Sequence, residues 1–149
     1  MGLRAQERSS LASGPVVFLC GFSGVFRAME TVDISRGGEY LVAHVLETCG
    51  VRVIRVDLSG HDLWCRTPSN RLVTVQVKTS SKARDGRNGS SSRYEFYDRQ
   101  GGMKPDIYGF VALDLGLVLF AAEMGKRRSI VAGSFTEEAM LASVARFFY

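Results

Sequence analysis

The sequence has few of the residues that build disulfide frameworks or metal clusters. Its 149 residues include only three cysteines, three prolines and two histidines. Cys20, Cys49 and Cys65 are widely spaced and odd in number, and none belongs to a CxxC pair. Neither a disulfide framework nor a zinc cluster is therefore predicted. This use of cysteine favours a reducing, cytoplasmic compartment.

The apolar run at residues 15–26 is also too short to cross a bilayer. It has twelve residues, whereas a membrane-spanning helix needs about twenty. We therefore expect no membrane association. The flanking charges and the absence of a small-residue cleavage pattern make a signal peptide the weaker interpretation. An alternative start at Met29 would make residues 1–28 an N-terminal extension outside the fold, with residues 29–149 as a single domain.

The composition is that of one domain of ordinary size with a mild positive charge. A hydrophobic fraction of 46% suffices for one core, whereas two independent domains would each be marginal. The net charge is +4. Residues 66–104 contain nine basic and three acidic side chains, a net +6, so the rest of the chain carries −2. A concentrated basic segment favours a nucleic-acid partner.

A first amphipathic helix is predicted from Asp33 or Ser35 to Gly50. Its apolar residues recur with a spacing of about 3.6 residues, and Gly50 supplies a C-terminal stop. Glu39 falls at the border of the apolar stripe. We therefore expect its carboxylate to face the rest of the fold. The apolar positions are Leu41, Val42, Val45, Leu46 and Cys49.

The segments after this helix alternate as β-strands do. Residues 51–57 and 62–66 flank a Ser59-Gly60 turn and predict a hairpin. Residues 72–79 alternate most clearly, with valines on one face and polar side chains on the other. The valines are Val73, Val75 and Val77, and the polar residues are Thr74, Gln76 and Lys78.

Further strands and a second helix complete the predicted fold. A short strand is expected at residues 94–97. The apolar runs at 107–113 and 117–122 predict a second hairpin with central, two-face burial. Ser134 and Glu137 form a capping box for a final helix. The expected fold is α/β, with a central mixed β-sheet of about five strands flanked by helices.

Residues 80–92 have the composition of a mobile basic loop, because they are rich in Ser, Gly and Arg and poor in apolar residues. Such a loop can follow DNA phosphates and become ordered on binding. A solvated surface is the usual alternative. The predicted DNA-binding residues are Lys82, Arg84, Arg87 and Arg93.

Glu39, Asp62, Gln76 and Lys78 could meet at one site. Phosphodiester hydrolysis needs oxygen ligands for a hard cation such as Mg²⁺, and a positive group near the attacking water. Asp62, the side-chain carbonyl of Gln76 and the backbone carbonyl of Val77 could supply the ligands. Lys78 could lower the pKa of the water or neutralise the developing charge.

These residues, in this order, resemble the PD-(D/E)XK nuclease superfamily of restriction endonucleases, Holliday-junction resolvases and some homing endonucleases. The matching segments are Gly38-Glu39, residues 60–63, residues 75–79 and residues 106–111. The family pattern would make Glu39 the helix carboxylate, Asp62 the metal-binding aspartate and Lys78 the catalytic lysine. His61 stands where proline is commonest, and Gln76 stands where Asp or Glu is expected, as in the QxK forms of the family.

The resemblance implies a restriction-endonuclease-like core and a Mg²⁺-dependent endodeoxyribonuclease, with Mn²⁺ able to substitute. Its metal ligands would be Asp62, Gln76, Val77 and Glu39. The implied substrate is duplex or branched DNA. Because many enzymes of this family pair two active sites, the resemblance also implies a homodimer.

Simpler interpretations of these residues remain open. Glu39 could be a solvated glutamate that complements the helix dipole, and Asp62 a turn residue. Gln76 and Lys78 could form the solvent face of an edge strand. The alternative functions are a non-catalytic DNA-binding module on the same scaffold, with a weakened metal site, and an interaction domain without a nucleic-acid role.

Structural roles are predicted for several other residues. We expect His44 on the surface and His61 as a hydrogen-bonded loop histidine. We expect Trp64 to pack in the core, although it could border the cleft beside Asp62. Asp106 should begin a strand. Residues 126–128 should form a solvated turn, although they and Glu123 could instead approach DNA. Tyr94, Phe96 and Tyr97 offer a surface on which bases could stack, with core packing as the alternative.

Overall fold

The computed structural model describes residues 31–99 and 101–149. The predicted N-terminal extension, residues 1–28, lies outside the described residues, as does Cys20. No helix within the described ranges is both long enough and apolar enough to cross a membrane.

The first helix, α1 (Thr31–Thr48), is already formed at Thr31 and so begins before the predicted start. Asp33 lies in its first turn, where a carboxylate complements the helix dipole, and not at the cap. The predicted stop at Gly50 is confirmed by its positive φ of 83°, a conformation that glycine adopts without strain. The stripe of Val42, Val45 and Leu46 is buried.

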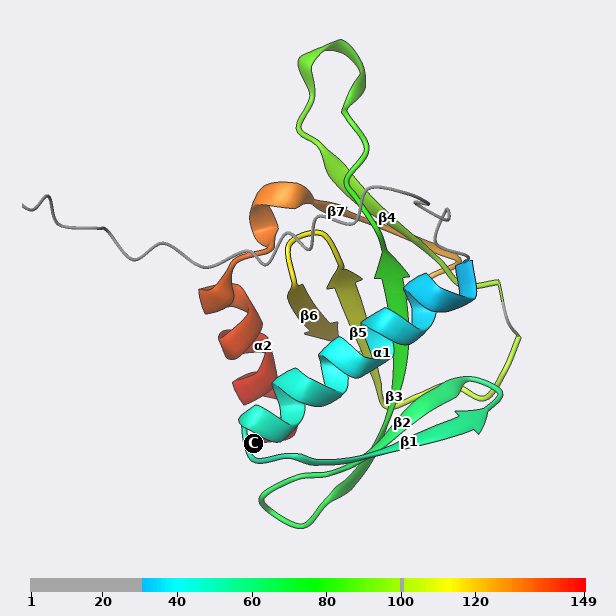
Figure 1. Ribbon diagram of the computed structural model, residues 1–149, viewed down its shortest axis with the longest axis vertical. Helices are drawn as coiled ribbons and strands as arrows, with labels where there is room; N and C mark the ends of the chain where they lie inside the picture. The colour runs from blue at the N-terminus through cyan, green and yellow to red at the C-terminus, as the bar shows by residue number, and fades with distance from the viewer. Residues whose placement is uncertain (1–30, 100) are drawn as a thin grey trace, which may run out of the picture.

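A five-stranded sheet forms the centre of the fold (Figure 1). Its strand order is β1-β2-β3-β5-β6, and all neighbours are antiparallel except β3 and β5, which are parallel. The predicted mixed α/β sheet and its first hairpin are therefore confirmed. The strands are β1 (Arg52–Leu58), β2 (His61–Arg66), β3 (Leu72–Ser80), β5 (Ile107–Ala112) and β6 (Leu117–Ala121).

One alternative interpretation and one predicted strand position are wrong. The edge-strand interpretation of Gln76 and Lys78 fails because β3 lies in the middle of the sheet, between β2 and β5. Strand β6 was expected to be central but forms an edge. Its hydrophobicity has another cause, since one face packs with the helices and the other with a second sheet.

That second sheet consists of β4 (Arg93–Tyr97) and β7 (Arg127–Val131), which pair antiparallel. Strand β7 was not predicted, because its basic residues 127 and 128 are typical of a turn. Both helices cover one face of the main sheet, and the small sheet covers part of the other. Tyr94 and Phe96 are buried there, 1% and 2% exposed, so they are core aromatics and not a surface for bases.

The C-terminal helix, α2 (Glu137–Phe148), packs against β6 through Val144 and Phe148. Its N-cap is Thr136, whose hydroxyl accepts a hydrogen bond from the Ala139 backbone N–H at 3.1 Å. The predicted capping box at Ser134 is wrong, because that residue ends the 3₁₀ turn η2 (Ala132–Ser134). The Thr136 hydroxyl lies close enough to the first turn of α2 to accept a hydrogen bond from one of its free backbone N–H groups.

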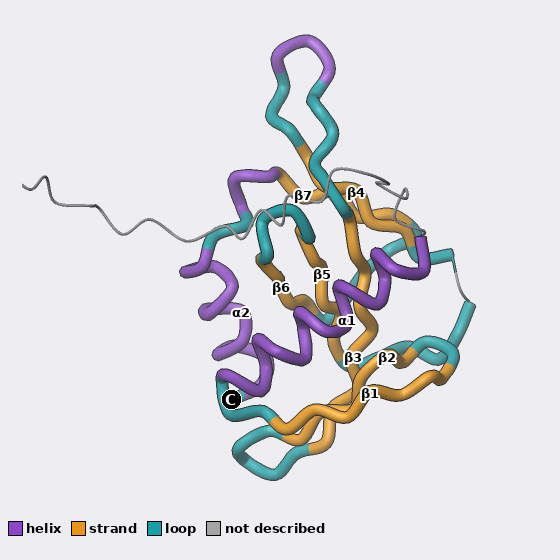
Figure 2. The backbone as a smooth tube through the Cα atoms, viewed as in Figure 1, coloured by secondary structure: helices purple, strands orange, loops and turns teal. Residues whose placement is uncertain are grey.

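The basic loop projects from the end of β3 away from the body of the molecule (Figures 1 and 2). It has more structure than its composition predicted. Arg84 and Arg93 form an isolated antiparallel bridge, and the tip is the 3₁₀ turn η1 (Arg87–Gly89). The loop is thus a hairpin-like extension that carries Lys82, Arg84 and Arg87 beyond the sheets, whereas Arg93 belongs to β4.

Candidate active site

Strands β2 and β3 separate at Asp62, next to the last paired residue of β2. Their pairing extends from Arg66 opposite Leu72 to Leu63 opposite Val75, whereas β3 continues beside β5 as far as Ser80. The carboxylate of Asp62 enters this fork, where its Oδ2 accepts a hydrogen bond from the Val77 backbone N–H at 2.6 Å. Because the N–H and C=O of one strand residue point the same way, the Val77 carbonyl also faces the fork.

Helix α1 passes very close to β3 beside this fork. A Cβ atom added at Gly38 would overlap the side chain of Thr79, so only glycine permits this approach. The approach places Glu39 over the fork, with a side chain 18% exposed. Glu39 therefore faces the sheet, as predicted, and is not a fully solvated first-turn glutamate.

Glu39 and Asp62 line one cavity of about 660 Å³. Arg55 on β1 also lines it and binds Glu39 Oε2 through Nη2 at 2.6 Å and through Nε at 3.0 Å. Arg55 was not predicted from the sequence, because its contact with Glu39 depends on the packing of β1 against α1. The cavity thus combines three carboxylates, those of Glu39, Asp57 and Asp62, with two guanidinium groups, of which the one on Arg55 already pairs with Glu39. Its other residues are Thr31, Val32, Ser35, Arg36 and Val56.

The surroundings of Asp62 favour its protonated form. Burial raises the pKa of its carboxyl above the ordinary value, and the charge of Glu39 raises it further. The Val77 N–H, Lys78 and His61 act in the opposite direction. The net effect is a raised pKa. Asp62 therefore interacts electrostatically with both Glu39 and Lys78, which approach it from different elements.

Lys78 and Gln76 point to the face of β3 opposite α1. Val77 and Thr79 face the helix, and side chains alternate along a strand. Lys78 Nζ lies 2.9 Å from Asp98 Oδ1, and its side chain is only 13% exposed. Gln76 is 5% exposed. Neither residue lines the cavity of Glu39 and Asp62, so the four predicted residues surround the fork from two sides and do not share one open pocket.

Asp98, which follows β4, was not predicted from the sequence. An acidic residue after an aromatic strand carries no signal of its own, and the contact requires the small sheet to lie over β3. The Asp98 backbone N–H donates to the Lys126 carbonyl at 3.0 Å, which anchors the residue. Asp98 therefore holds the predicted catalytic lysine from the neighbouring sheet.

The predicted roles of the neighbouring residues have mixed outcomes. His44 is exposed, as expected. His61 is not a hydrogen-bonded loop residue, because it begins β2, is buried and has no partner for Nε2 among the described residues. Trp64 is not a core residue, since it is 47% exposed. Asp106 immediately precedes β5, and its Oδ2 accepts from the Thr74 N–H and hydroxyl at 2.8 and 2.9 Å.

The predicted DNA-binding residues differ in whether their side chains already form hydrogen bonds within the fold. Lys82, Arg84 and Arg87 are exposed on the projecting loop. Arg93 is also exposed, but its guanidinium donates to Ser129 Oγ at 2.6 Å and to the Ser129 carbonyl at 3.2 Å. Arg93 therefore joins β4 to β7, and the first three side chains form the accessible positive surface of the loop.

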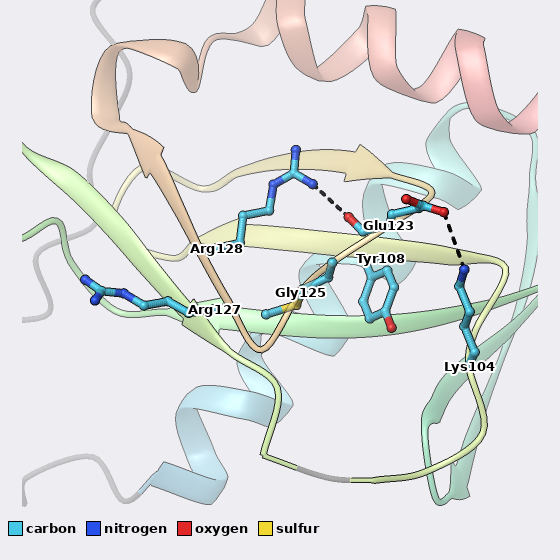
Figure 3. A pocket seen from close by; sticks show the side chains of 7 residues that line it. Lys104, Tyr108, Glu123, Gly125, Arg127 and Arg128 are labelled. Atoms are coloured by element: carbon cyan, nitrogen blue, oxygen red, sulfur yellow. Dashed lines mark hydrogen bonds and ion pairs between the residues drawn. The ribbon is translucent and has the colours of Figure 1, made fainter.

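A second cavity, of about 580 Å³, lies beside the small sheet (Figure 3). Three basic side chains line it, but each has a partner within the fold. Lys104 lies 3.6 Å from Glu123, Arg127 Nε lies 2.7 Å from Glu95, and Arg128 Nη1 donates to the Glu123 carbonyl at 2.8 Å. This cavity is therefore a weaker anion site than its arginines alone suggest.

The described residues contain no cluster of three or more His, Cys, Asp or Glu side chains arranged to hold a metal ion. A cation at the fork would have to combine Glu39 and Asp62 with amide or backbone oxygens. Hard cations accept such mixed oxygen ligands. Carboxylate ligands alone do not complete a site in this part of the chain.

The fold is a mixed five-stranded sheet with helices packed on it. A nuclease of known structure has a similar fold. A bacterial homing endonuclease, I-Ssp6803I, has a similar structure, with a TM-score of 0.56 and 17% sequence identity. The similarity covers 68% of this chain and 75% of that one. Neither a family model nor a curated protein matches the sequence. The comparison therefore establishes a similar fold, and the residues of the fork must carry any argument about chemistry.

Proposed function

We propose that the chain is a metal-dependent endonuclease that hydrolyses phosphodiester bonds of DNA. The observation that carries the proposal is the position of Asp62, whose carboxylate lies in the fork between β2 and β3 and shares a cavity with Glu39. The similar fold of a protein described as a homing endonuclease supports the same function. The basic loop supplies a surface for the DNA backbone.

The chemistry of the fork suits a hard divalent cation. Asp62 is partly desolvated and repelled by Glu39, which together raise its pKa. A cation would relieve both penalties, since it replaces the lost hydration and separates the two negative charges. Glu39, Asp62 and the Val77 carbonyl would hold Mg²⁺ or Mn²⁺, and the amide oxygen of Gln76 could join them only by turning from the other face of β3 toward the fork. Such an ion activates water and neutralises charge on the phosphate.

Lys78 would act from the opposite face of β3. Its ammonium group can orient the attacking water or stabilise the charge that develops on the phosphoryl oxygens. For either role Lys78 must exchange its contact with Asp98 for one with substrate. Lys82, Arg84 and Arg87 would contact phosphates away from the cleavage point.

Plasmid nicking in the presence of Mg²⁺ or Mn²⁺ tests this assignment. We expect nicking by the wild type and its loss in Asp62→Asn and in Lys78→Ala. Glu123→Gln is a suitable control, because Glu123 is exposed and its side chain makes only a 3.6 Å contact with Lys104. Undiminished nicking by both site variants would refute the proposal.

A second candidate is a DNA-binding module without catalysis. The ion pair between Lys78 and Asp98 and the neutral, buried Gln76 favour it, because both weaken the chemistry available at the fork. This function predicts DNA retention that falls with salt, is independent of Mg²⁺, and yields no cleaved product. Nicking that depends on Asp62 would exclude it.

A further inference from the structure

One part of the main sheet has a bare apolar face. The small sheet packs over β5, β6 and the end of β3 but leaves β1, β2 and the start of β3 uncovered on that side. Ile54, Trp64 and Leu72 are exposed there by 65%, 47% and 77%. Ile54 pairs with Trp64, and Leu72 pairs with Arg66, so all these side chains share one face.

This face is hollowed and has a positive rim. A depression of about 830 Å³ is lined by Ile54, Trp64 and Leu72 together with Arg52 and Arg66. These five residues are called the Trp64 face. Both arginines are exposed, and neither forms an ion pair with a carboxylate among the described residues.

The one acidic side chain in this depression is already engaged. Glu47 Oε1 accepts the Val53 backbone N–H at 2.6 Å. Arg66 is oriented by a hydrogen bond from Nε to Asn70 Oδ1. The face therefore offers an indole ring and two aliphatic side chains between two guanidinium groups. That combination is complementary to a chain that alternates flat bases with negative phosphates.

The Trp64 face and the fork both include residues of β2. Trp64 follows Asp62 by two residues on β2, so both side chains leave the strand on the same side, about 7 Å apart along it. The two depressions share no lining residue, so a DNA strand that contacts both Asp62 and Trp64 would cross β2 between them.

We propose that the Trp64 face binds unpaired nucleotides of single-stranded DNA, with a base stacked on Trp64 and phosphates held by Arg52 and Arg66. The inference rests on the proposed function for its choice of DNA. It adds to the proposed function a preference for DNA with an unpaired segment beside the cleaved bond. A regular duplex cannot make this contact, because its bases are already stacked on one another. A second copy of the chain is less suitable, because it would bring the same two arginines to the interface.

Trp64 is the only tryptophan in the chain, so tryptophan fluorescence, excited selectively over that of tyrosine, reports on this face alone. The protein, in EDTA to prevent cleavage, is titrated with a thymidine oligonucleotide of twelve residues and with a twelve-base-pair duplex. We expect saturable quenching by the single strand, weakened by salt, and binding at least about fivefold weaker for the duplex, the lower end of the contribution of one stacked base. Equal binding of both DNAs, or no quenching, would overturn the proposal.

Variants separate this face from the rest of the protein. Arg52→Ala with Arg66→Ala should weaken binding of the single strand about tenfold or more. Arg146→Ala is the matched control, because Arg146 is an exposed arginine on α2 and should leave binding unchanged. A labelled oligonucleotide and Trp64→Ala provide a second measurement by anisotropy, with a loss of at least about fivefold expected. Unchanged affinity in Trp64→Ala would overturn the proposal.

The competing occupant and the proposed function have distinct signatures. If the face joins two copies, tryptophan emission should shift to the blue as the protein is concentrated without DNA. Sedimentation should then show a dimer that Leu72→Ser dissociates, and this result would overturn the proposal. Nicking that is lost in Asp62→Asn tests the nuclease activity separately, since quenching in EDTA requires no cleavage.

Discussion

The ammonium group of Lys78 lies 2.9 Å from the carboxylate of Asp98, across the boundary between the two sheets. Both side chains are mostly covered, with exposures of 13% and 24%. A charge in such a position depends on its partner, because removal of one member leaves the other poorly solvated. The pair therefore links the proposed catalytic lysine to the stability of the contact between β3 and β4.

Asp98→Asn is expected to lower the free energy of unfolding by about 1 to 3 kcal/mol, because it leaves the Lys78 charge unpaired. Urea denaturation measures the change. Glu123→Gln provides the comparison, because its pair with Lys104 is exposed and should contribute less than about 1 kcal/mol. Equal losses of unfolding free energy in the two variants would show that burial beneath the small sheet does not strengthen the pair of Lys78 and Asp98.

Gly38→Ala should destabilise the protein, whereas Gly37→Ala should not. Both residues lie in α1, where alanine is favoured over glycine by about 1 kcal/mol. A Cβ atom at Gly38 overlaps Thr79, but one at Gly37 meets only Leu113, at 3.7 Å. Overpacking at Gly38 should cost about 1 to 3 kcal/mol and displace Glu39. Thermal unfolding of the two variants checks this, and equal stabilisation of both would contradict the close approach.

The helix stripe and the alternation of β3 could be predicted because they are local periodic patterns with one dominant burial direction. Strand β7 could not, because its basic residues resemble a turn and its partner, β4, lies some thirty residues away in the sequence. The edge position of β6 was also hidden, since burial by a second sheet gives the same composition as a central position.

The residues of the candidate site also divide into those that local sequence patterns predicted and those that they did not. The position of Glu39 at the border of the stripe predicted its approach to the sheet, and Asp62 followed from the turn before its strand. Arg55 and Asp98 were not predicted, because their ion pairs depend on which elements pack together. The burial of Gln76 was not predicted for the same reason. A polar side chain on a strand carries no sequence signal for a second sheet that covers it.

Asp62→Asn is expected to change the pH dependence of stability. The folded state raises the pKa of Asp62, mainly through burial. The favourable contribution of the protonated form is therefore fully present below the unfolded pKa and is lost as pH rises through the folded pKa. The variant should consequently gain stability relative to the wild type between acidic and neutral pH.

Urea denaturation from about pH 3 to pH 8, on either side of the ordinary aspartate pKa, measures this difference. Asp85→Asn, at an exposed position in the basic loop, controls for the loss of one negative charge. A divalent cation should raise the melting temperature of the wild type but not of Asp62→Asn. A pH-independent difference would contradict the raised pKa, and an equal metal effect would remove Asp62 from the ligands.

Replacement of Lys82, Arg84 and Arg87 by alanine should reduce the salt dependence of DNA binding. Each lost phosphate contact lowers the slope of log affinity against log salt by about 0.9 for duplex DNA and about 0.7 for single strands. Binding measured at several salt concentrations gives the slope. Arg146→Ala, on α2, should leave it unchanged. A triple variant with the wild-type slope would show that the projecting loop does not contact phosphates.

Asp106→Ala should show that the carboxylate of Asp106 stabilises the fold and takes no part in nicking, in contrast to the carboxylates of the fork. Asp106 Oδ2 accepts two hydrogen bonds from Thr74, and the Asp106 N–H donates to the Thr74 hydroxyl at 3.0 Å, which ties the start of β5 to β3. Loss of the carboxylate should lower the free energy of unfolding by about 2 kcal/mol, since hydrogen bonds to a charged group are stronger than neutral ones. Thr74→Val removes only the hydroxyl and should cost less. Nicking per folded molecule should persist in both variants, and its loss in Asp106→Ala would place this aspartate in the catalytic machinery.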